Sequence, residues 1–156
     1  MGTFIVQGGR PLKGEITPQG AKNEALQVIC ASLLTPDKVT LRNIPDIADV
    51  AKIIELLGSM GVIIKRESPS TISFEARQIN LDYLQTTEFR DQSVSLRGSI
   101  MVVGPLLARF GKAFIPKPGG DKIGRRRLDT HFIAVSYTHL RAHETVLDLV
   151  CRLLLE

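Results

Sequence analysis

A stretch from Pro116 to Phe132, PKPGGDKIGRRRLDTHF, combines residue types that could bind an anion and transfer a proton to it. Gly119 and Gly120 free the backbone to fold tightly and aim its amides inward. The arginines 125–127 could donate paired hydrogen bonds to phosphate oxygens. A run of arginines is also typical of a solvated face. The stretch is not a Walker-type loop, because no Gly-Lys-Ser/Thr follows, and it lacks G-x-G-x-x-G spacing.

Asp121 is a carboxylate among these cations, and two roles are open to it. It could form a salt bridge with Lys122 or an arginine, and such neighbours lower the pKa of a carboxyl group. It could instead act as a proton donor, because a polyanion crowded against it in a closed, dry site would raise its pKa.

Two further positions could contact an anion. Lys22 and Asn23 stand at the expected start of a helix, where backbone N–H groups are unpaired and a partial positive charge develops. Arg97 interrupts an apolar run, and Gly98 after it permits close approach of a ligand or another backbone. The alternatives are a solvated lysine, a capping asparagine and an arginine that extends from a helix end into water.

The elements that must position these residues alternate between helical and strand periodicity. Apolar residues recur at helical spacing over residues 23–34 and 47–57, and a longer apolar helix is expected over 95–111. Strands are expected near residues 4–6 and in the segments 13–20, 39–44, 62–67, 71–76, 79–83 and 112–117. The order from residue 14 to 76 is strand, helix, strand, helix, strand, strand, which predicts an α/β fold.

The composition narrows the classes of protein. A chain of 156 residues, of which 44% are hydrophobic, suits one globular domain. A net charge of +4 and a pI near 9.3 favour an anionic partner, whether nucleotide, phosphate ester or nucleic acid. Only 5% of residues are aromatic and none interleaves with the arginines, which argues against a nucleic-acid-binding module. The sequence lacks a signal-peptide pattern and an apolar run of membrane-spanning length, so we expect a cytosolic location.

The two cysteines, Cys30 and Cys151, have no disulfide or metal-ligand spacing, and we expect buried, inert thiols. Residues 134–156 differ from the rest of the chain. His139 and His143 could share a metal if they lay on a helix, and residues 145–156 could form an amphipathic helix. The same segment resembles the conceptual translation of a sequencing-library adapter, which is the interpretation that we favour. The biological sequence would then end near Ile133, and the tail would have no function to infer.

Three blocks taken together resemble a known family: GAKNEAL at 20–26, LRGSI at 96–100 and PGGDKIGRRRLDTH at 118–131. They are similar in order and spacing to the UDP-N-acetylglucosamine 1-carboxyvinyltransferases, enolpyruvyl transferases that open bacterial peptidoglycan synthesis. The resemblance runs from about residue 3 to 133 and covers the early part of the family's chain. It implies a partial inverted α/β barrel built from repeated βαβαββ units. Residues 1–21 would belong to the second lobe, and residues 22–133 would form an incomplete first lobe.

The resemblance also implies roles for individual residues. The reaction would transfer the enolpyruvyl group of phosphoenolpyruvate to the sugar 3-hydroxyl of UDP-N-acetylglucosamine and release phosphate, with no metal or organic cofactor. Many members carry a cysteine, which fosfomycin alkylates, where this chain has its general acid. The matched positions are Lys22 and Asn23 for phosphoenolpyruvate, Arg97 for the nucleotide sugar, Asp121 for the general acid, Arg126 for the phosphate, and Arg127, Leu128, Asp129 and Thr130 for the uridine side.

Three alternatives stay open on the sequence. The sister enolpyruvyl transferase of the shikimate pathway shares the fold and phosphoenolpyruvate but uses a different acceptor. A basic nucleic-acid-binding module would explain the arginine run, and a purely structural domain would leave the three blocks as coincidence. Because the family's later site residues are absent, we expect the chain alone to be inactive, with open sheet edges.

Overall fold

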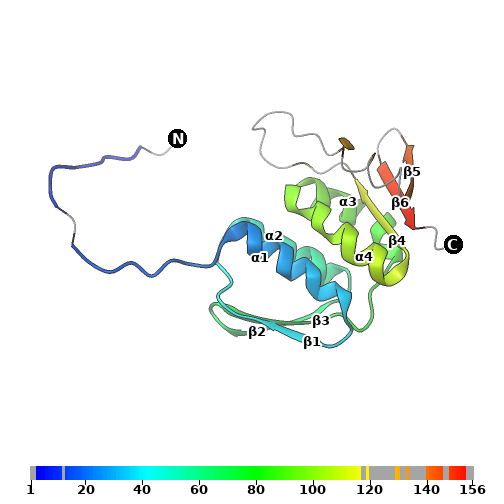
Figure 1. The fold of residues 1–156 in the computed structure, drawn as a ribbon, viewed down its shortest axis with the longest axis horizontal. Coiled ribbons are helices and arrows are strands. Elements are labelled where there is room, and N and C mark those ends of the chain that lie inside the picture. The colour runs from blue at the N-terminus through cyan, green and yellow to red at the C-terminus, as the bar shows by residue number, and fades with distance from the viewer. Residues whose placement is uncertain are drawn as a thin grey trace.

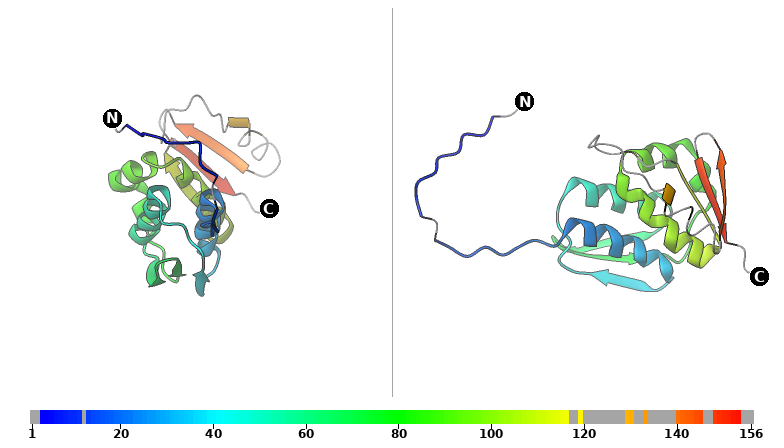
Figure 2. Two further views of the ribbon diagram at one scale, coloured as in Figure 1. Left: turned by 90° about the vertical axis from the view of Figure 1, so that its left-hand side faces the viewer. Right: turned by 45° about the horizontal axis from the view of Figure 1, so that its top comes forward.

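The computed structural model contains a packed body and an extended N-terminal arm (Figures 1 and 2). It describes residues 3–11, 13–116, 119, 129–130, 133, 140–145 and 148–153, and the side chains only as far as residue 133. In the arm, Phe4, Ile5, Val6 and Ile16 are all at least 87% exposed. In the described part of the chain, no helix combines the length and the apolar character that a membrane crossing requires.

The first half of the body is a three-stranded antiparallel sheet under two helices (Figure 1). Strands β1 (Lys38–Leu41) and β2 (Ile63–Ser68) both pair with β3 (Thr71–Glu75), so the order is β1-β3-β2. Helices α1 (Lys22–Ala31) and α2 (Ala48–Ser59) cover one face of this sheet. The central strand therefore lies inside the body, and the β1 and β2 edges bound the sheet.

The core forms where the helical stripes meet the inner face of β3. Ile72 and Phe74, two residues apart on that strand, are each 1% exposed. The apolar positions of both helices recur at helical spacing, so each helix buries one stripe. Full burial of a leucine, isoleucine or valine side chain contributes about 1.5–3 kcal/mol to stability. The buried helical residues are Ala25, Leu26, Ile29 and Cys30 on α1 and Val50, Ile53, Leu56 and Leu57 on α2.

The second half of the body is mostly helical. After the 3-10 turn η2 (Asp82–Gln85) come α3 (Thr87–Val94), the 3-10 helix η3 (Arg97–Val102) and α4 (Val103–Phe110). Gly111 ends α4 in the left-handed conformation, with φ of 68°, and leads into β4 (Lys112–Pro116). A second sheet of order β4-β6-β5 contains β5 (Leu140–Thr145) and β6 (Asp148–Leu153).

Several predicted elements are confirmed. The first predicted helix is α1 extended by the 3-10 turn η1 (Ser32–Leu34), and the second is α2. The strands expected at 39–44, 62–67, 71–76 and 112–117 correspond to β1, β2, β3 and β4. These elements have clear apolar periodicity, which is why sequence alone located them.

Other predictions about the elements are wrong. The segments 3–11 and 13–20 contain no strand, because none of the six strands in the described sheets lies beside them to pair. The strand expected at 79–83 is replaced by η2, because the Asn80 side chain accepts hydrogen bonds from the backbone of Asp82 and Tyr83. Where residues 145–156 could have formed an amphipathic helix, the structure has β6.

The long helix expected over 95–111 is also wrong, because η3 and α4 divide it at Val103. This break puts Pro105 in the first turn of α4, where a missing N–H costs nothing. Helix α3 was missed because its sequence, TEFRDQSV, buries only Phe89 and Ser93. One local signal marks its start: the Thr86 side chain caps it by accepting a hydrogen bond from the Phe89 N–H at 3.1 Å.

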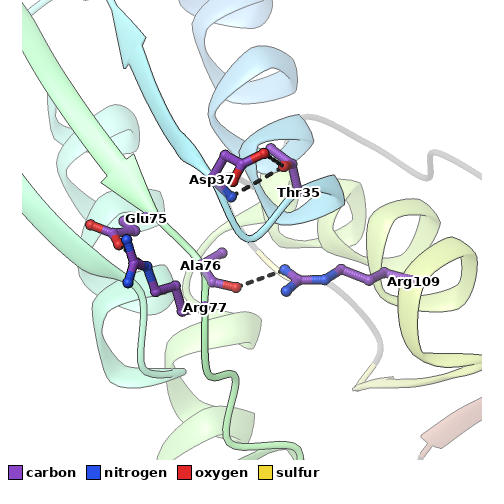
Figure 3. A network of polar contacts seen from close by, with 6 residues as sticks. All are labelled: Thr35, Asp37, Glu75, Ala76, Arg77 and Arg109. Carbon is purple, nitrogen blue, oxygen red and sulfur yellow. Dashed lines mark hydrogen bonds and ion pairs between the residues drawn. The ribbon is translucent and has the colours of Figure 1, made fainter.

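Arg109 joins three elements at the C-terminal end of α1 (Figure 3). Its guanidinium donates hydrogen bonds to the carbonyl oxygens of Leu33 at 3.0 Å and Ala76 at 2.7 Å. It also stacks on the Phe110 ring, 4.8 Å from the centroid. Because Leu33 lies in η1, the cation satisfies a carbonyl at the end of a helical segment, where the dipole favours positive charge. Arg109 therefore fastens α4 to both η1 and the end of β3.

Candidate functional site

Lys22 and Asn23 are the first two residues of α1, as the sequence predicts. The residue before them, Ala21, is extended and makes no side-chain cap. Helix α2 likewise starts after Ile47 without a side-chain cap. The starts of these two helices thus differ from that of α3, where Thr86 supplies the capping oxygen.

Gly20 allows α1 to begin where it does. A Cβ on this residue would overlap the carbonyl oxygen of Asn43 and lie 3.2 Å from Cδ of Pro45. Asn43 itself has a φ of 58° in the loop between β1 and α2. Because the two backbones touch at a glycine, the start of α1 is held against the loop that leads into α2.

The Lys22 ammonium forms an ion pair across this junction. Its Nζ lies 2.8 Å from Oδ2 of Asp49, in the first turn of α2. The two side chains are 50% and 39% exposed, so the pair is accessible to solvent. A lysine at a helix start adds to the positive end of the dipole, which makes a nearby anion favourable. In this structure Asp49 supplies one.

The second predicted block lies against the same helix. Arg97 starts η3 and is half-buried, and Gly98 after it faces α1, because a Cβ there would lie 3.1 Å from Cδ1 of Leu26. Lys52 of α2 reaches the same region by donating to the Ser95 carbonyl oxygen at 3.4 Å. The structure therefore brings the segment around Arg97 against both α1 and α2.

The third block is described only in part. At Gly119 a Cβ would overlap the carbonyl oxygen of Val94 and lie 3.2 Å from its Cγ1, so the glycine packs on the last residue of α3. Asp129 and Thr130 are helical, half-buried and exposed respectively. The predicted site residues Asp121, Arg126, Arg127 and Leu128 lie outside the described residues.

Gly98 and Gly119 show how the blocks meet. Each is a position where a side chain would obstruct a neighbouring segment, and the neighbours are α1 and the end of α3. Val94 is only three residues before Arg97, so the second and third blocks also approach each other. The arrangement leads from α1 through η3 to Gly119, two residues before Asp121 in the sequence. Basic groups at such a junction are suited to binding an anionic substrate.

Sequence reasoning missed Asp49 and Lys52. Asp49 sits in the first turn of a predicted helix, where an acidic residue is ordinarily explained by the helix dipole. Its partner Lys22 is 27 residues earlier, and no short-range pattern connects them. Only the packing of α1 against α2 reveals the pair.

The thiol of Cys30 is confirmed as buried, at 1% exposure, and desolvation raises its pKa to about 12. The thiol is therefore a core group that stays protonated, and so is not nucleophilic, at neutral pH. The side chains of Cys151 and His143, and all of His139, lie outside what the structure describes. Within the described residues, no three His, Cys, Asp or Glu side chains gather as a metal site. A groove of about 370 Å³ contains none of the predicted site residues; it is lined by Leu81, Leu84, Gln85, Lys112, Ala113 and Phe114.

The fold defines the class of protein. The chain superimposes on the crystal structure of the enolpyruvyl transferase NikO from Streptomyces tendae with a TM-score of 0.70. The alignment covers 93% of this chain and 31% of that one, at 20% sequence identity. This likeness is one of fold, and it confirms the expected partial α/β enolpyruvyl transferase fold.

The family follows from sequence. Residues 6–139 match the family described as EPSP synthase (3-phosphoshikimate 1-carboxyvinyltransferase), and the chain belongs to that family. It is 57% identical over 135 residues to a UDP-N-acetylglucosamine 1-carboxyvinyltransferase from Bacteroides thetaiotaomicron, and 56% identical over 135 residues to one from Porphyromonas gingivalis. It is 45% identical over 132 residues to one from Bradyrhizobium diazoefficiens.

The chain spans about a third of the length of these relatives. The Bacteroides thetaiotaomicron alignment covers 86% of this chain and 31% of that protein. The Bradyrhizobium alignment covers 85% and 30%. The match is therefore to one part of a longer enzyme.

Proposed function

We propose that this chain is part of an enzyme that transfers the enolpyruvyl group of phosphoenolpyruvate to the 3-hydroxyl of UDP-N-acetylglucosamine and releases phosphate. The observation that carries the proposal is the 56–57% identity over 135 residues to relatives named for that transfer. Of the three sequence blocks that imply it, the first two lie on the adjoining elements α1 and η3, and Gly119 of the third packs on Val94 at the end of α3.

In this proposal the start of α1 receives phosphoenolpyruvate. Lys22 and Asn23 contact its charged groups, and Arg126 binds near its phosphate. Asp121 protonates the methylene carbon as the sugar hydroxyl attacks C2 and gives up its proton to a base in the remainder of the enzyme. Phosphate and one proton of the new methyl group then leave together, which restores the carbon–carbon double bond. Arg97 contacts the nucleotide sugar, and the segment from Arg127 to Thr130 lines its uridine side.

The cellular role follows from the same reaction. The product would commit UDP-N-acetylglucosamine to peptidoglycan, and the enzyme would contribute to cell-wall biogenesis, cell shape and division from the bacterial cytoplasm. The chemistry needs no metal or organic cofactor, because protonation and loss of phosphate require only acid, base and charge stabilisation. Phosphoenolpyruvate and the nucleotide sugar are the partners, and nucleic acid and membrane are not.

We further propose a division of the chain into three parts. Residues 1–21 belong to the second lobe, residues 22–133 to an incomplete first lobe, and residues 134–156 to a non-native tail. The exposed apolar residues of the arm support the first point, because Phe4, Val6 and Ile16 have no packing in the described chain. Reading the source DNA beyond codon 133 tests the last: continuous genomic coding sequence for the tail would contradict it.

A chimaera tests the activity. Residues 1–133 replace the matching part of the Bacteroides thetaiotaomicron relative, and phosphate release is measured with phosphoenolpyruvate and either UDP-N-acetylglucosamine or 3-phosphoshikimate. We expect turnover with the nucleotide sugar alone. Turnover with 3-phosphoshikimate alone would transfer the assignment to the sister enzyme that the family description names. The isolated 156-residue chain is the control, and we expect it to release no phosphate.

A further inference from the structure

Helix α2 carries none of the site residues predicted from the sequence, yet its first two turns contact the first of the three predicted blocks and the residue just before the second. Asp49 binds Lys22 of α1 with 2.8 Å between Oδ2 and Nζ. Lys52 follows three residues later, which puts it on the same side of the helix. Its Nζ lies 3.4 Å from the Ser95 carbonyl oxygen, two residues before Arg97. One face of α2 thus contacts the two flanking blocks.

The backbone of Asp49 is held in place by buried neighbours. It lies between the helix start and Val50, which is 2% exposed, and Ile53 one turn later is fully buried. A carboxylate in the first turn also interacts favourably with the dipole of its own helix. The contact between Gly20 and the Asn43 carbonyl then holds the start of α1 against the loop before α2. The carboxylate therefore has a defined place relative to the Lys22 backbone.

Lys22 has the opposite properties. Its four-carbon side chain has many rotamers, and its ammonium stands at the positive end of α1, where the dipole disfavours it. Without a counter-charge the side chain would spread over many solvated directions. We propose that Asp49 is a positioning residue, which holds the Lys22 ammonium beside the start of α1 so that it is ready to bind the phosphate of phosphoenolpyruvate. This inference rests on the proposed function.

The chemistry of the ammonium allows both contacts at once. A lysine has three N–H donors, and the bond to Asp49 uses one. Two donors stay available for phosphate oxygens. Because Asp49 already orders the Lys22 side chain, less conformational entropy is lost when the substrate binds. The ion pair between Lys22 and Asp49 would persist in the complex.

The experiment uses the same chimaera with substitutions at Asp49. We expect Asp49→Ala to lower kcat/KM for phosphoenolpyruvate about tenfold and to leave KM for the nucleotide sugar unchanged. Asp49→Asn should retain most of the activity, because its amide oxygen can still accept the bond from Lys22. A competing role, in which Asp49 merely repels the substrate anion, predicts the opposite sign: both variants would bind phosphoenolpyruvate more tightly. That result, or no change in Asp49→Ala, overturns the proposal.

A double-mutant cycle shows whether Asp49 acts through Lys22. In a Lys22→Met background, Asp49→Ala should cost nothing further, because there is no ammonium to position. An undiminished tenfold loss in that background contradicts a positioning role. The matched control is Glu67→Ala, which breaks the Lys38–Glu67 pair of equal length, 2.8 Å, and similar exposure, 53% and 34%. We expect this control to leave kcat/KM unchanged.

The two proposals fail in distinguishable ways. If the unsubstituted chimaera does not use UDP-N-acetylglucosamine, the proposed function fails first. If it turns over normally and Asp49→Ala matches it, only the positioning role fails. Thermal unfolding of every variant shows whether lost activity reflects lost folded protein. Because both ion pairs are solvent-exposed, we expect Asp49→Ala and Glu67→Ala to shift the unfolding midpoint by similar, small amounts.

Discussion

The two ends of α1 both adjoin a cation, but they use it differently. At the C-terminal end, Arg109 donates to the Leu33 and Ala76 carbonyl oxygens and stacks on Phe110. At the N-terminal end, Lys22 adds its charge to the positive end of the dipole and contacts the half-exposed Asp49. Where a cation meets backbone carbonyls, its charge stabilises the fold. Where it meets only an exposed carboxylate, its charge is accessible to a ligand.

The only cysteine on α1 also lies toward its C-terminal, structural end. Cys30 lies toward the C-terminal end of α1, buried, with its pKa raised to about 12 by desolvation. Beyond Gly119 the sequence has a carboxylate, Asp121, at the position where the resemblance implies a reactive cysteine in many family members. The following predictions test whether one end is for chemistry and the other for stability.

The largest effect should come from Asp121→Cys in the chimaera. We expect time-dependent inactivation by fosfomycin in this variant and none in the parent, because a carboxylate is a far poorer soft nucleophile than a thiolate. Residual phosphate release after incubation measures it. The parent retains Cys30, so it also controls for alkylation at the buried end. Potent inactivation of the parent would contradict the prediction.

Lys22→Met should separate activity from stability at the N-terminal end. Loss of one preorganised charge on the phosphate should lower kcat/KM at least 100-fold, about 3 kcal/mol, with little change in the free energy of unfolding. Steady-state kinetics and denaturant unfolding measure the two quantities. If Lys22→Met instead lowers stability and leaves kcat/KM unchanged, the cation at the N-terminal end would serve the fold, as Arg109 does at the C-terminal end.

Gly20→Ala tests the backbone contact at the same end. The added Cβ would overlap the Asn43 carbonyl oxygen, so either α1 or the loop must move. We expect a loss of about 3 kcal/mol in the free energy of unfolding, at the upper end of overpacking effects because the obstacle is backbone. Gly104→Ala is the control, because nothing lies within 4 Å of its added Cβ. It should change the free energy of unfolding much less than Gly20→Ala does, and equal effects at the two glycines would contradict the contact.

Arg109→Met should affect stability alone. It removes two hydrogen bonds from a charged donor and leaves the Leu33 and Ala76 carbonyl oxygens without that partner. We expect the free energy of unfolding to fall by about 2 kcal/mol, while KM for phosphoenolpyruvate is unchanged. Arg109→Lys should recover part of the loss, because it keeps a cation at the end of η1. A raised KM in either variant would mean that the C-terminal end also serves the site.

The smallest effect concerns Cys30. Its folded-state pKa, about 12, is above the ordinary value of 9.0, so the folded protein holds this proton more tightly. The contribution to stability is complete below about pH 9 and is lost as the pH rises toward 12. We expect denaturant unfolding to show a steeper decline of stability in the parent than in Cys30→Ala over that range. Identical slopes would mean that the thiol is not desolvated.

Sequence patterns located most of the body but not its irregular half. The apolar stripes of α1 and α2 and the strand pattern at 71–76 were sufficient, because each helix buries one apolar stripe and β3 alternates Ile72 and Phe74 with polar residues. Helix α3 and the break at Val103 were not, because α3 is mostly polar and Pro105 is compatible with a first turn. Lys22, Asn23 and Arg97 stay predictions from the resemblance, and the comparisons confirm the family on which it relied.

The sequence by itself determined the residue types available at the predicted site and the periodicity that builds α1, α2 and the first sheet. Only the tertiary structure decided which groups surround Lys22. Asp49 became its partner as α1 packed against α2, where Gly20 lets the start of α1 approach the Asn43 backbone; Gly98 likewise lets the segment around Arg97 approach the Leu26 side chain of α1. The reason is physical: periodicity records which face of an element is buried, whereas the identity of what it is buried against depends on contacts between residues far apart in the chain.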